Sequence, residues 1–240
     1  MKKYRFFVDS KSHTARNFLI TDKTTVGHIS LVLRLKKGDE IILFDGFGTE
    51  YEAKIGYIDK KQVAGLILRA YQCQLPDKPK VLLAQSLPRA GKMDDIVRMN
   101  TEAGIIGFIL FESENSIPKV EDYTETKVEH LKKVAQEALR QSEGVLLPEF
   151  KGPIKFNDLL KADADKKIIL HSRDVEGSIN LKEIQIQKNE TVVLVIGPEG
   201  GLSPREVESA KNSGFTIAHL DMPILRTETA GIVASGIILS

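Results

Sequence analysis

Apolar positions in the first third of the chain gather in short runs separated by turn signals. The runs lie at residues 4–8, 28–35, 40–44, 50–58 and 62–70. Their lengths and their β-branched and aromatic content favour strands. Lys37-Gly38-Asp39 and Asp45-Gly46-Phe47-Gly48 supply residues that tolerate positive φ, which tight strand connections require. We therefore predict a small β-barrel-like domain over residues 1–72.

Beyond Pro76 and Pro79 the apolar runs become continuous and alternate with longer amphipathic stretches. The runs lie at residues 81–84, 105–111, 168–171, 192–196 and 215–220. Continuous apolarity suits strands that are buried on both faces, as in a parallel sheet covered by helices. A helical apolar period from about 124 to 142 supplies one such helix. The pattern predicts an α/β domain with a mostly parallel sheet over residues 73–240.

The strand predicted at 192–196 leads into a glycine-rich turn and a well-marked helix start. Residues 197–201 read Gly-Pro-Glu-Gly-Gly, and Ser203 with Glu206 has the spacing of a capping box. Glycines at the carboxyl end of a strand let the backbone approach a ligand, at the edge where open α/β sheets bind ligands. A tight strand-to-helix turn is the alternative interpretation, and the spacing does not match a triphosphate-binding loop.

A second polar cluster, Leu225-Arg-Thr-Glu-Thr-Ala, separates the strand predicted at 215–220 from the apolar C-terminal stretch. In a purely structural interpretation, Thr227 caps the last helix and Arg226 pairs with Glu228. In a functional interpretation, the same polar groups face a ligand.

Composition and charge narrow the class of protein. The 240 residues are 42% hydrophobic, which is typical of a globular chain. Residues 1–75 hold 13 Lys and Arg against 8 Asp and Glu, although the whole chain has a net charge of only +1. This asymmetry favours a polyanion-binding N-terminal module, with an ordinary solvated surface as the alternative.

Other features bear on location and on metals. The single cysteine, Cys73, suggests a reducing compartment, so we expect a cytoplasmic protein. No apolar stretch approaches the roughly 20 residues that span a bilayer, and the N-terminus lacks the apolar core of a signal peptide. The five histidines show no metal-ligand spacing, so no metal site is predicted.

Taken together, the glycine turn and the polar cluster resemble the signature pair of RsmE-type methyltransferases in the SPOUT superfamily. The cluster begins about 25 residues after the turn. The likeness extends to segments that resemble the PUA-like RNA-binding domain and the middle motifs of that family. These segments are Arg5-Phe-Phe, residues 28–39, Lys92-Met93, Thr101-Glu102 with Gly104, and Gln141-Ser142 with Pro148.

The resemblance implies an S-adenosylmethionine-dependent methyltransferase that modifies N3 of a uridine in small-subunit (16S) ribosomal RNA. It implies a C-terminal SPOUT α/β trefoil-knot domain with a mostly parallel sheet, joined to an N-terminal PUA-like β-barrel. It also implies a homodimer whose partner is ribosomal RNA or the small ribosomal subunit.

The resemblance places the cofactor among three loops. The implied cofactor-binding residues are Leu170, His171, Ile196, Gly197, Glu199, Gly200, Gly201, Leu220, Ile224, Leu225, Thr227 and Ala230. For catalysis, we expect Arg226 to hold RNA phosphate or developing negative charge on the base, and Glu228 to orient the base or assist proton removal. Arg5, Arg16 and Arg34 are candidates for phosphate contacts, with ordinary surface or ion-pairing arginines as the alternative.

Five positions depart from the residues expected of the family. Met99 replaces a lysine, Asn115 and Gly144 replace arginines, and Asp221 and Pro223 replace a glycine and an arginine. Two further hypotheses follow from these replacements. One is a catalytically silent RNA-binding or ribosome-assembly protein of the same fold, and the other is a methyltransferase with a different RNA target.

Overall fold

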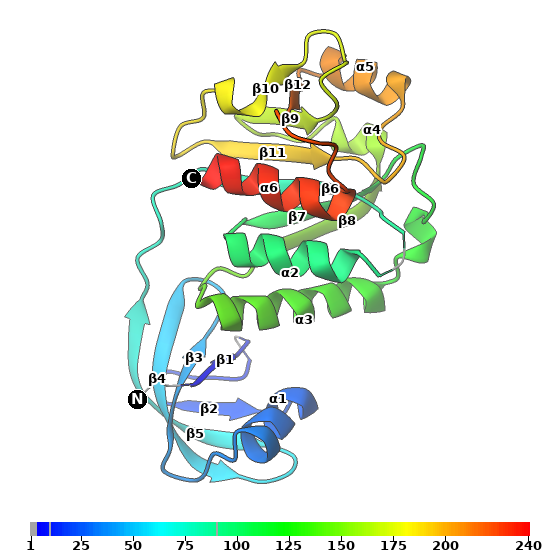
Figure 1. The fold of residues 1–240 in the computed structure, drawn as a ribbon. Coiled ribbons are helices and arrows are strands. Elements are labelled where there is room, and N and C mark those ends of the chain that lie inside the picture. Colours follow the sequence, from blue (N-terminus) through cyan, green and yellow to red (C-terminus); the bar gives the residue numbers. More distant parts are fainter. Residues whose placement is uncertain (1–3, 10, 90) are drawn as a thin grey trace. The chain divides into compact units, whose positions relative to one another are not determined.

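The computed structural model describes residues 4–9, 11–89 and 91–240, and the chain forms two compact units (Figure 1). The first unit contains residues 1–75 together with Leu139–Leu146. The second contains Pro76–Ala138 and Leu147–Ser240. The first unit thus includes a segment distant in sequence, which a single boundary at residue 72 leaves out.

The first unit is built on a five-stranded mixed sheet with the order β1-β3-β4-β5-β2. Its strands are β1 (Tyr4–Phe7), β2 (Asn17–Ile20), β3 (Glu40–Phe44), β4 (Thr49–Ile58) and β5 (Val63–Gln72). Strand β1 pairs in parallel with β3, and the other pairs are antiparallel. The sheet encloses a core of its own that includes Phe6, Phe18, Ile41 and Ile55. The β unit predicted for the N-terminal third is therefore confirmed, as a half-barrel.

The strand predicted over residues 28–35 is wrong. The π-helix η1 (His28–Val32) occupies this segment and continues directly from helix α1 (Lys23–Gly27). The Asp22 carboxylate accepts the backbone N–H of Thr25 at 2.9 Å and thereby caps the first turn. Val26 and Ile29, three positions apart, are both buried. A contiguous apolar run concealed this helical spacing.

The second unit contains a seven-stranded sheet with the order β10-β12-β9-β11-β6-β7-β8. Its strands are β6 (Lys80–Ser86), β7 (Gly107–Glu112), β8 (Glu149–Lys155), β9 (Lys166–Leu170), β10 (Ile179–Asn180), β11 (Thr191–Ile196) and β12 (Thr216–His219). Every neighbouring pair is parallel, which confirms the predicted α/β sheet. Strand β8 escaped prediction because none of its residues is fully buried, so it lacks an apolar run.

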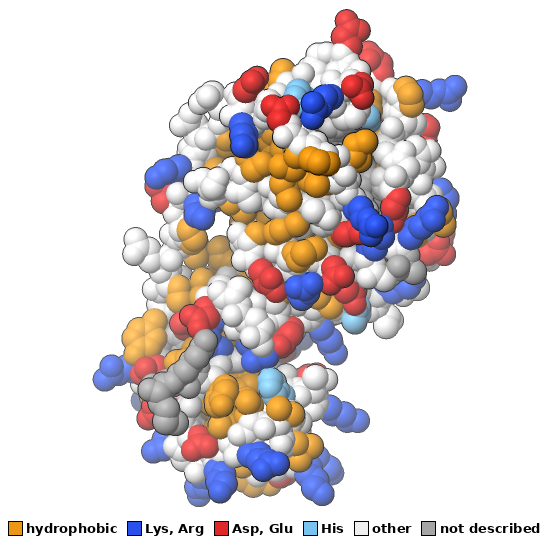
Figure 2. Space-filling model, in the orientation of Figure 1, with side chains coloured by type: hydrophobic (Ala, Val, Ile, Leu, Met, Phe, Trp, Pro, Cys, Tyr) orange, Lys and Arg blue, Asp and Glu red, His pale blue; other side chains and the backbone are white. Residues whose placement is uncertain are grey.

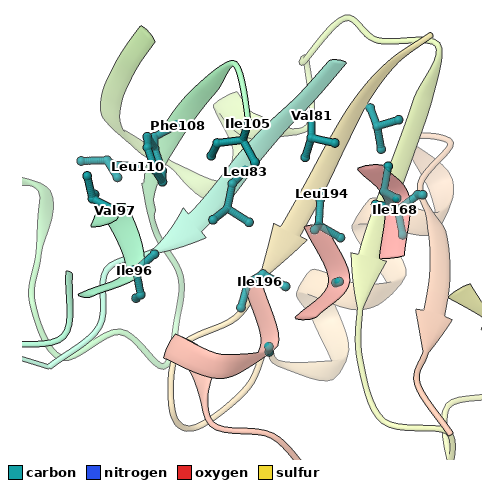
Figure 3. Close-up of a cluster of buried hydrophobic side chains, with 14 of the residues drawn as sticks. Val81, Leu83, Ile96, Val97, Ile105, Phe108, Leu110, Ile168, Leu194 and Ile196 are labelled. Carbon is teal, nitrogen blue, oxygen red and sulfur yellow. The ribbon is translucent and has the colours of Figure 1, made fainter. Parts of the chain in front are cut away.

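Helices cover both faces of this sheet (Figure 1). They are α2 (Met93–Ala103), α3 (Glu125–Ser142), α4 (Phe156–Leu159), α5 (Pro204–Asn212) and α6 (Thr227–Leu239), with the 3-10 turns η2 (Val120–Asp122) and η3 (Leu181–Glu183). Side chains alternate along β11: Leu194 and Ile196 join one core cluster (Figure 3), whereas Val193 and Val195 join a second cluster. This two-sided burial explains why the strand is continuously apolar.

After β12 the chain returns across the sheet. Helix α6 packs against β6 and β11, with α2 and η3 also in contact with it. Because all seven strands run in the same direction, the loops after β6, β7, β9, β11 and β12 leave from the same edge of the sheet. The knotted threading that the resemblance implies stays a prediction.

Candidate functional site

A hydrogen bond joins the two motifs that the sequence singles out. The Thr227 hydroxyl donates to the carbonyl of Gly197 at 2.7 Å, and the Gln85 side-chain amide donates to the Thr227 hydroxyl at 3.0 Å. Both Thr227 and Gln85 are buried. Arg226, not Thr227, occupies the N-cap position of α6. The hydroxyl of Thr227 therefore links two loops instead of capping its own helix.

Lys92 makes a second link between the same loops. Its ammonium lies 3.0 Å from Glu199 Oε1 and 3.1 Å from Glu228 Oε2. The backbone N–H of Arg89 also donates to Glu199, at 3.2 Å. Glu228 thus pairs with Lys92, and not with Arg226 as the structural interpretation supposed. The loops after β6 and β11 and the first turn of α6 therefore meet through one cation and two carboxylates.

The electrostatics of this group favour its charged state. Partial burial raises the pKa of Glu228, but hydrogen bonds from its own backbone N–H and from Lys92 outweigh that effect, so the pKa is lowered overall. The same balance lowers the pKa of Glu199. Hydrogen bonds to Glu199 and then Glu228 raise the pKa of Lys92. All three groups are ionised at neutral pH, and together they have one net negative charge.

Backbone geometry shapes the glycine turn. Gly201 has a φ of +70°, and its N–H donates to the carbonyl of Pro198 at 2.8 Å. A Cβ on Gly197 would lie 3.2 Å from the backbone nitrogen of Leu202, which is too close for most side chains. The turn therefore depends on glycine and presents main-chain atoms to whatever lies beside it.

The capping box predicted for the following helix is confirmed. Ser203 Oγ accepts the N–H of Glu206 at 3.2 Å, and Glu206 Oε2 accepts the N–H of Ser203 at 2.9 Å. The other carboxylate oxygen of Glu206 accepts the N–H of Glu114 at 2.9 Å. The carboxylate, buried with its residue, therefore fixes the start of α5 and the loop after β7 together.

The third predicted loop begins with Leu170 and His171. Burial lowers the pKa of the His171 imidazole, and a hydrogen bond with the backbone of Leu202 offsets part of that effect. His171 Nδ1 accepts the N–H of Ser172 at 2.8 Å, as it does in the neutral tautomer with a proton on Nε2. The histidine side chain thus contacts the loop after β11.

The apolar residues among the predicted cofactor-binding residues differ in how far they are exposed. Leu170, Leu220 and Leu225 are partly buried and pack against the core cluster, while Ile196 and Ala230 are buried in it. Ile224 is 97% exposed and makes no comparable packing contact. Apart from Ile224, the predicted apolar residues form a base beneath the three loops.

Two of the departures from the family pattern have partners. The Asn115 amide donates to the carbonyls of Gly200 and Gly201, at 3.3 and 3.1 Å. Asp221 accepts from the side-chain amide of Asn180 at 2.6 Å. Both replacements therefore hold loops of the site. Met99 is half-buried on α2, Pro223 is exposed in the loop after β12, and Gly144 belongs to the first unit.

The structure places the three candidate RNA-binding arginines differently from one another. Arg5 is 9% exposed, its Nε donates to Glu50 at 3.0 Å, and its Nη2 donates to the carbonyl of Gly144 at 2.9 Å. This placement favours the structural alternative for Arg5. Arg16 and Arg34 are exposed.

Sequence reasoning left four site residues out of the predicted set, namely Gln85, Lys92, Asn115 and Glu206. Gln85 had a local signal, because it is a polar residue at the end of an apolar strand. Lys92 stood in a segment that resembled the family. The contacts themselves depend on which strands are neighbours, and the sequence pattern does not encode that order.

No helix in residues 4–9, 11–89 and 91–240 has the length and apolarity to cross a membrane. Within the same ranges, no three His, Cys, Asp or Glu side chains are grouped so as to hold a metal ion.

Comparisons with known proteins add family information to this geometry. The RNA methyltransferase domain family matches residues 76–239, and the RNA methyltransferase PUA domain family matches residues 20–68. Ribosomal RNA small subunit methyltransferase E of Aquifex aeolicus is 32% identical over 93% of this chain and 95% of its own. The Bacillus subtilis protein of the same name is 30% identical over 96% of this chain and 93% of its own.

A solved methyltransferase structure has a similar fold. A methyltransferase from Legionella pneumophila, in complex with S-adenosylmethionine, matches with a TM-score of 0.90 at 25% identity, over 99% of this chain and 97% of that one.

Proposed function

Because the chain belongs to the ribosomal RNA small subunit methyltransferase E family, we propose that it transfers a methyl group from S-adenosylmethionine to N3 of a uridine in small-subunit ribosomal RNA. The observation that supports this most is the 2.7 Å hydrogen bond from the Thr227 hydroxyl to the Gly197 carbonyl. It brings the glycine turn and the polar cluster that begins at Leu225 together in one site. The protein would act in the cytoplasm, on ribosomal RNA or the small ribosomal subunit.

The residues at the sheet edge fit S-adenosylmethionine. The cofactor combines a sulfonium cation and an ammonium group with a flat base. The Lys92, Glu199 and Glu228 group supplies one net negative charge, and partly buried leucines lie beside it. Gln85 Oε1 is buried and has no hydrogen-bond partner among the described residues, so an acceptor is available for a ligand donor. When bound, the cofactor supplies an electrophilic methyl group. Gly197, Gly200, Gly201, Leu170, Leu220 and Leu225 would hold it.

The chain's own residues would position the nucleophile and handle its charge. Arg226 is exposed at the N-cap of α6, where its guanidinium is available to an RNA phosphate or to negative charge on the uracil. Glu228 has a lowered pKa, which favours a role in orienting the base over one in accepting its proton. Holding reactants in line supplies much of the rate enhancement in such transfers.

The RNA substrate would be a loop or another unpaired segment. A-form duplex hides the edges of its bases, and a base must leave the stack before its N3 can reach a pocket. Arg16 and Arg34, exposed on the PUA-like unit, are the candidates for phosphate contacts.

We also propose that the protein is a homodimer through α6. This helix is apolar around most of its circumference, and Ile232 and Val233 on its outer side stay partly exposed. Figure 2 shows hydrophobic side chains gathered over α6. A Cβ on Gly236 would meet nothing within 4 Å, so Gly236→Glu should leave the monomer intact. Analytical ultracentrifugation should show a dimer for the natural chain and a monomer for the variant. A natural chain that sediments as a monomer would contradict the proposal.

The activity test uses labelled cofactor and separate RNA fractions. Purified protein would be incubated with methyl-labelled S-adenosylmethionine and small-subunit ribosomal, large-subunit ribosomal or transfer RNA, followed by nucleoside analysis. We expect 3-methyluridine in the small-subunit fraction alone. Label in transfer RNA would show a different target, and cofactor binding without any label would show a silent protein.

The role of Arg226 has a direct test. Arg226→Ala should lower turnover by about 100-fold, the loss typical when one electrostatic contact to the transition state is removed, and leave the Kd for cofactor within about twofold. Arg98→Ala is the matched control, because Arg98 is exposed on α2 and pairs with Asp95. Full activity in Arg226→Ala would eliminate the proposed role.

A further inference from the structure

The loop after β7 lies against the glycine turn, although the two segments are far apart in sequence. Its Asn115 amide donates to the carbonyls of Gly200 and Gly201. The approach is close, because a Cβ on Gly200 would lie 3.3 Å from the Cβ of Asn115. A single side chain thus fixes the direction of two consecutive peptide groups in the turn.

The loop that bears Asn115 is itself firmly held. Ser86 at the end of β6, Ser113 and Ser116 are buried and lie within hydrogen-bonding distance of one another. The three Oγ to Oγ distances are 2.8, 3.0 and 3.0 Å. The N–H of Ser113 also donates to Ser116 Oγ at 3.1 Å. These bonds attach the turn of residues 113–116 to the end of a central strand.

A second bond ties this turn to the helix that follows the glycines. The N–H of Glu114 donates to the Glu206 carboxylate, whose other oxygen accepts from Ser203. The 113–116 turn therefore contacts the glycine turn through Asn115 and the start of α5 through Glu114. The two contacts act on both ends of residues 200–206.

We propose that Asn115 is a positioning residue for cofactor binding, acting through the carbonyls of Gly200 and Gly201. This inference rests on the proposed function, since it assigns Asn115 to the cofactor side of the site and not to the RNA. A turn held in its binding conformation before the ligand arrives loses less conformational freedom on binding. Removing the amide donor should therefore weaken cofactor binding without unfolding the chain, because Asn115 is an exposed residue.

Two variants and a control test the proposal in the full chain. Asn115→Ala removes the donor, and Asn115→Asp keeps the shape but sets a carboxylate against two carbonyls. We expect both to raise the Kd for S-adenosylmethionine about tenfold, which corresponds to about 1.4 kcal/mol, with the KM for RNA and the thermal midpoint unchanged. Asn189→Asp is the matched control, because Asn189 is exposed and lies in the turn before β11.

Hydrogen exchange without cofactor gives a readout independent of activity. Amides of residues 197–203 should exchange faster in both Asn115 variants than in the natural chain and the control. Unchanged exchange in both variants, or a raised KM for RNA with full cofactor affinity, would overturn the proposal. If the natural chain bound no S-adenosylmethionine, the proposed function would fail and Asn115 could not serve cofactor binding. If the natural chain bound it and the Asn115 variants bound it equally well, only the role of Asn115 would fail, and the proposed function would stand.

Discussion

Thr227 shows how one side chain connects parts of the chain that are distant in sequence. Its hydroxyl donates to Gly197 and accepts from Gln85, so the carboxyl ends of β11 and β6 meet at the first residue of α6. The sequence marked Thr227 as a cofactor contact by resemblance or, in the structural interpretation, as a helix cap. The actual partners lie 30 and 142 positions away, and only the strand order brings them near.

We predict that Thr227→Val weakens both stability and cofactor binding. The substitution keeps the shape but removes the donor to the Gly197 carbonyl and one of the two acceptors of the Gln85 amide, which still donates to the Ser86 carbonyl. A buried group left unsatisfied costs about 1–3 kcal/mol. Denaturant unfolding and calorimetry would measure the two losses. Thr229→Val is the control on the same helix, and equal behaviour of the two variants would contradict the assigned role.

The ion pairs of Lys92 predict a pH dependence. The pKa values of Glu199 and Glu228 lie below their ordinary 4.5, so their network contributes stability above that pH and loses it as pH falls through the lowered values. Lys92 has a pKa above its ordinary 10.5 and stays charged throughout this range. Lys92→Met removes one cause of the lowering, so loss of cofactor affinity on acidification should move to higher pH. An unmoved acid limb in binding titrations would refute this assignment.

At the scale of elements, sequence patterns located most of the second unit and less of the first. Runs of continuous apolarity marked strands such as β11 because both faces of the sheet are covered. Strand β2 is only four residues long and alternates between exposed and buried, so it gave little signal. The segment at 28–35 was misjudged because its dense apolar residues resemble a strand, although the buried Val26 and Ile29 follow a helical spacing.

The start of α5 offers a test of a feature that the sequence did predict. Ser203→Ala removes the N-cap acceptor of the helix and should destabilise the protein by about 1 kcal/mol. It should also accelerate exchange of the adjoining glycine turn. Ser209→Ala on the exposed side of α5 should change neither quantity. The midpoint of denaturant unfolding would compare the two.

At the scale of the whole molecule, the two units have different charge and different tasks in the proposal. The basic excess belongs to residues 1–75, while the cofactor loops belong to the second unit. Neither charge nor hydrophobic pattern indicated that Leu139–Leu146 joins the first unit. That association depends on tertiary contacts such as the hydrogen bond from Arg5 to Gly144, where an expected surface arginine is instead buried.

If the first unit binds RNA and the second binds cofactor, substitutions in the first unit should change RNA affinity without changing cofactor affinity. Arg16→Ala and Arg34→Ala should each weaken RNA binding and reduce the slope of log affinity against log salt by about 1, the value for one phosphate contact. The Kd for cofactor should not change. RNA titrations over a range of salt concentrations would measure the slope. An unchanged slope would show that Arg16 and Arg34 are ordinary surface arginines that make no phosphate contact.

In the proposed function, the glycine turn and the segment after β12 bind one molecule of S-adenosylmethionine together. Hydrogen exchange of the full chain, with and without cofactor, tests it most directly. We predict that the cofactor slows exchange in residues 196–202 and 220–230 at the same concentration and leaves residues 4–72 unchanged. Protection of only one of the two loops, or of neither, would contradict a shared binding site.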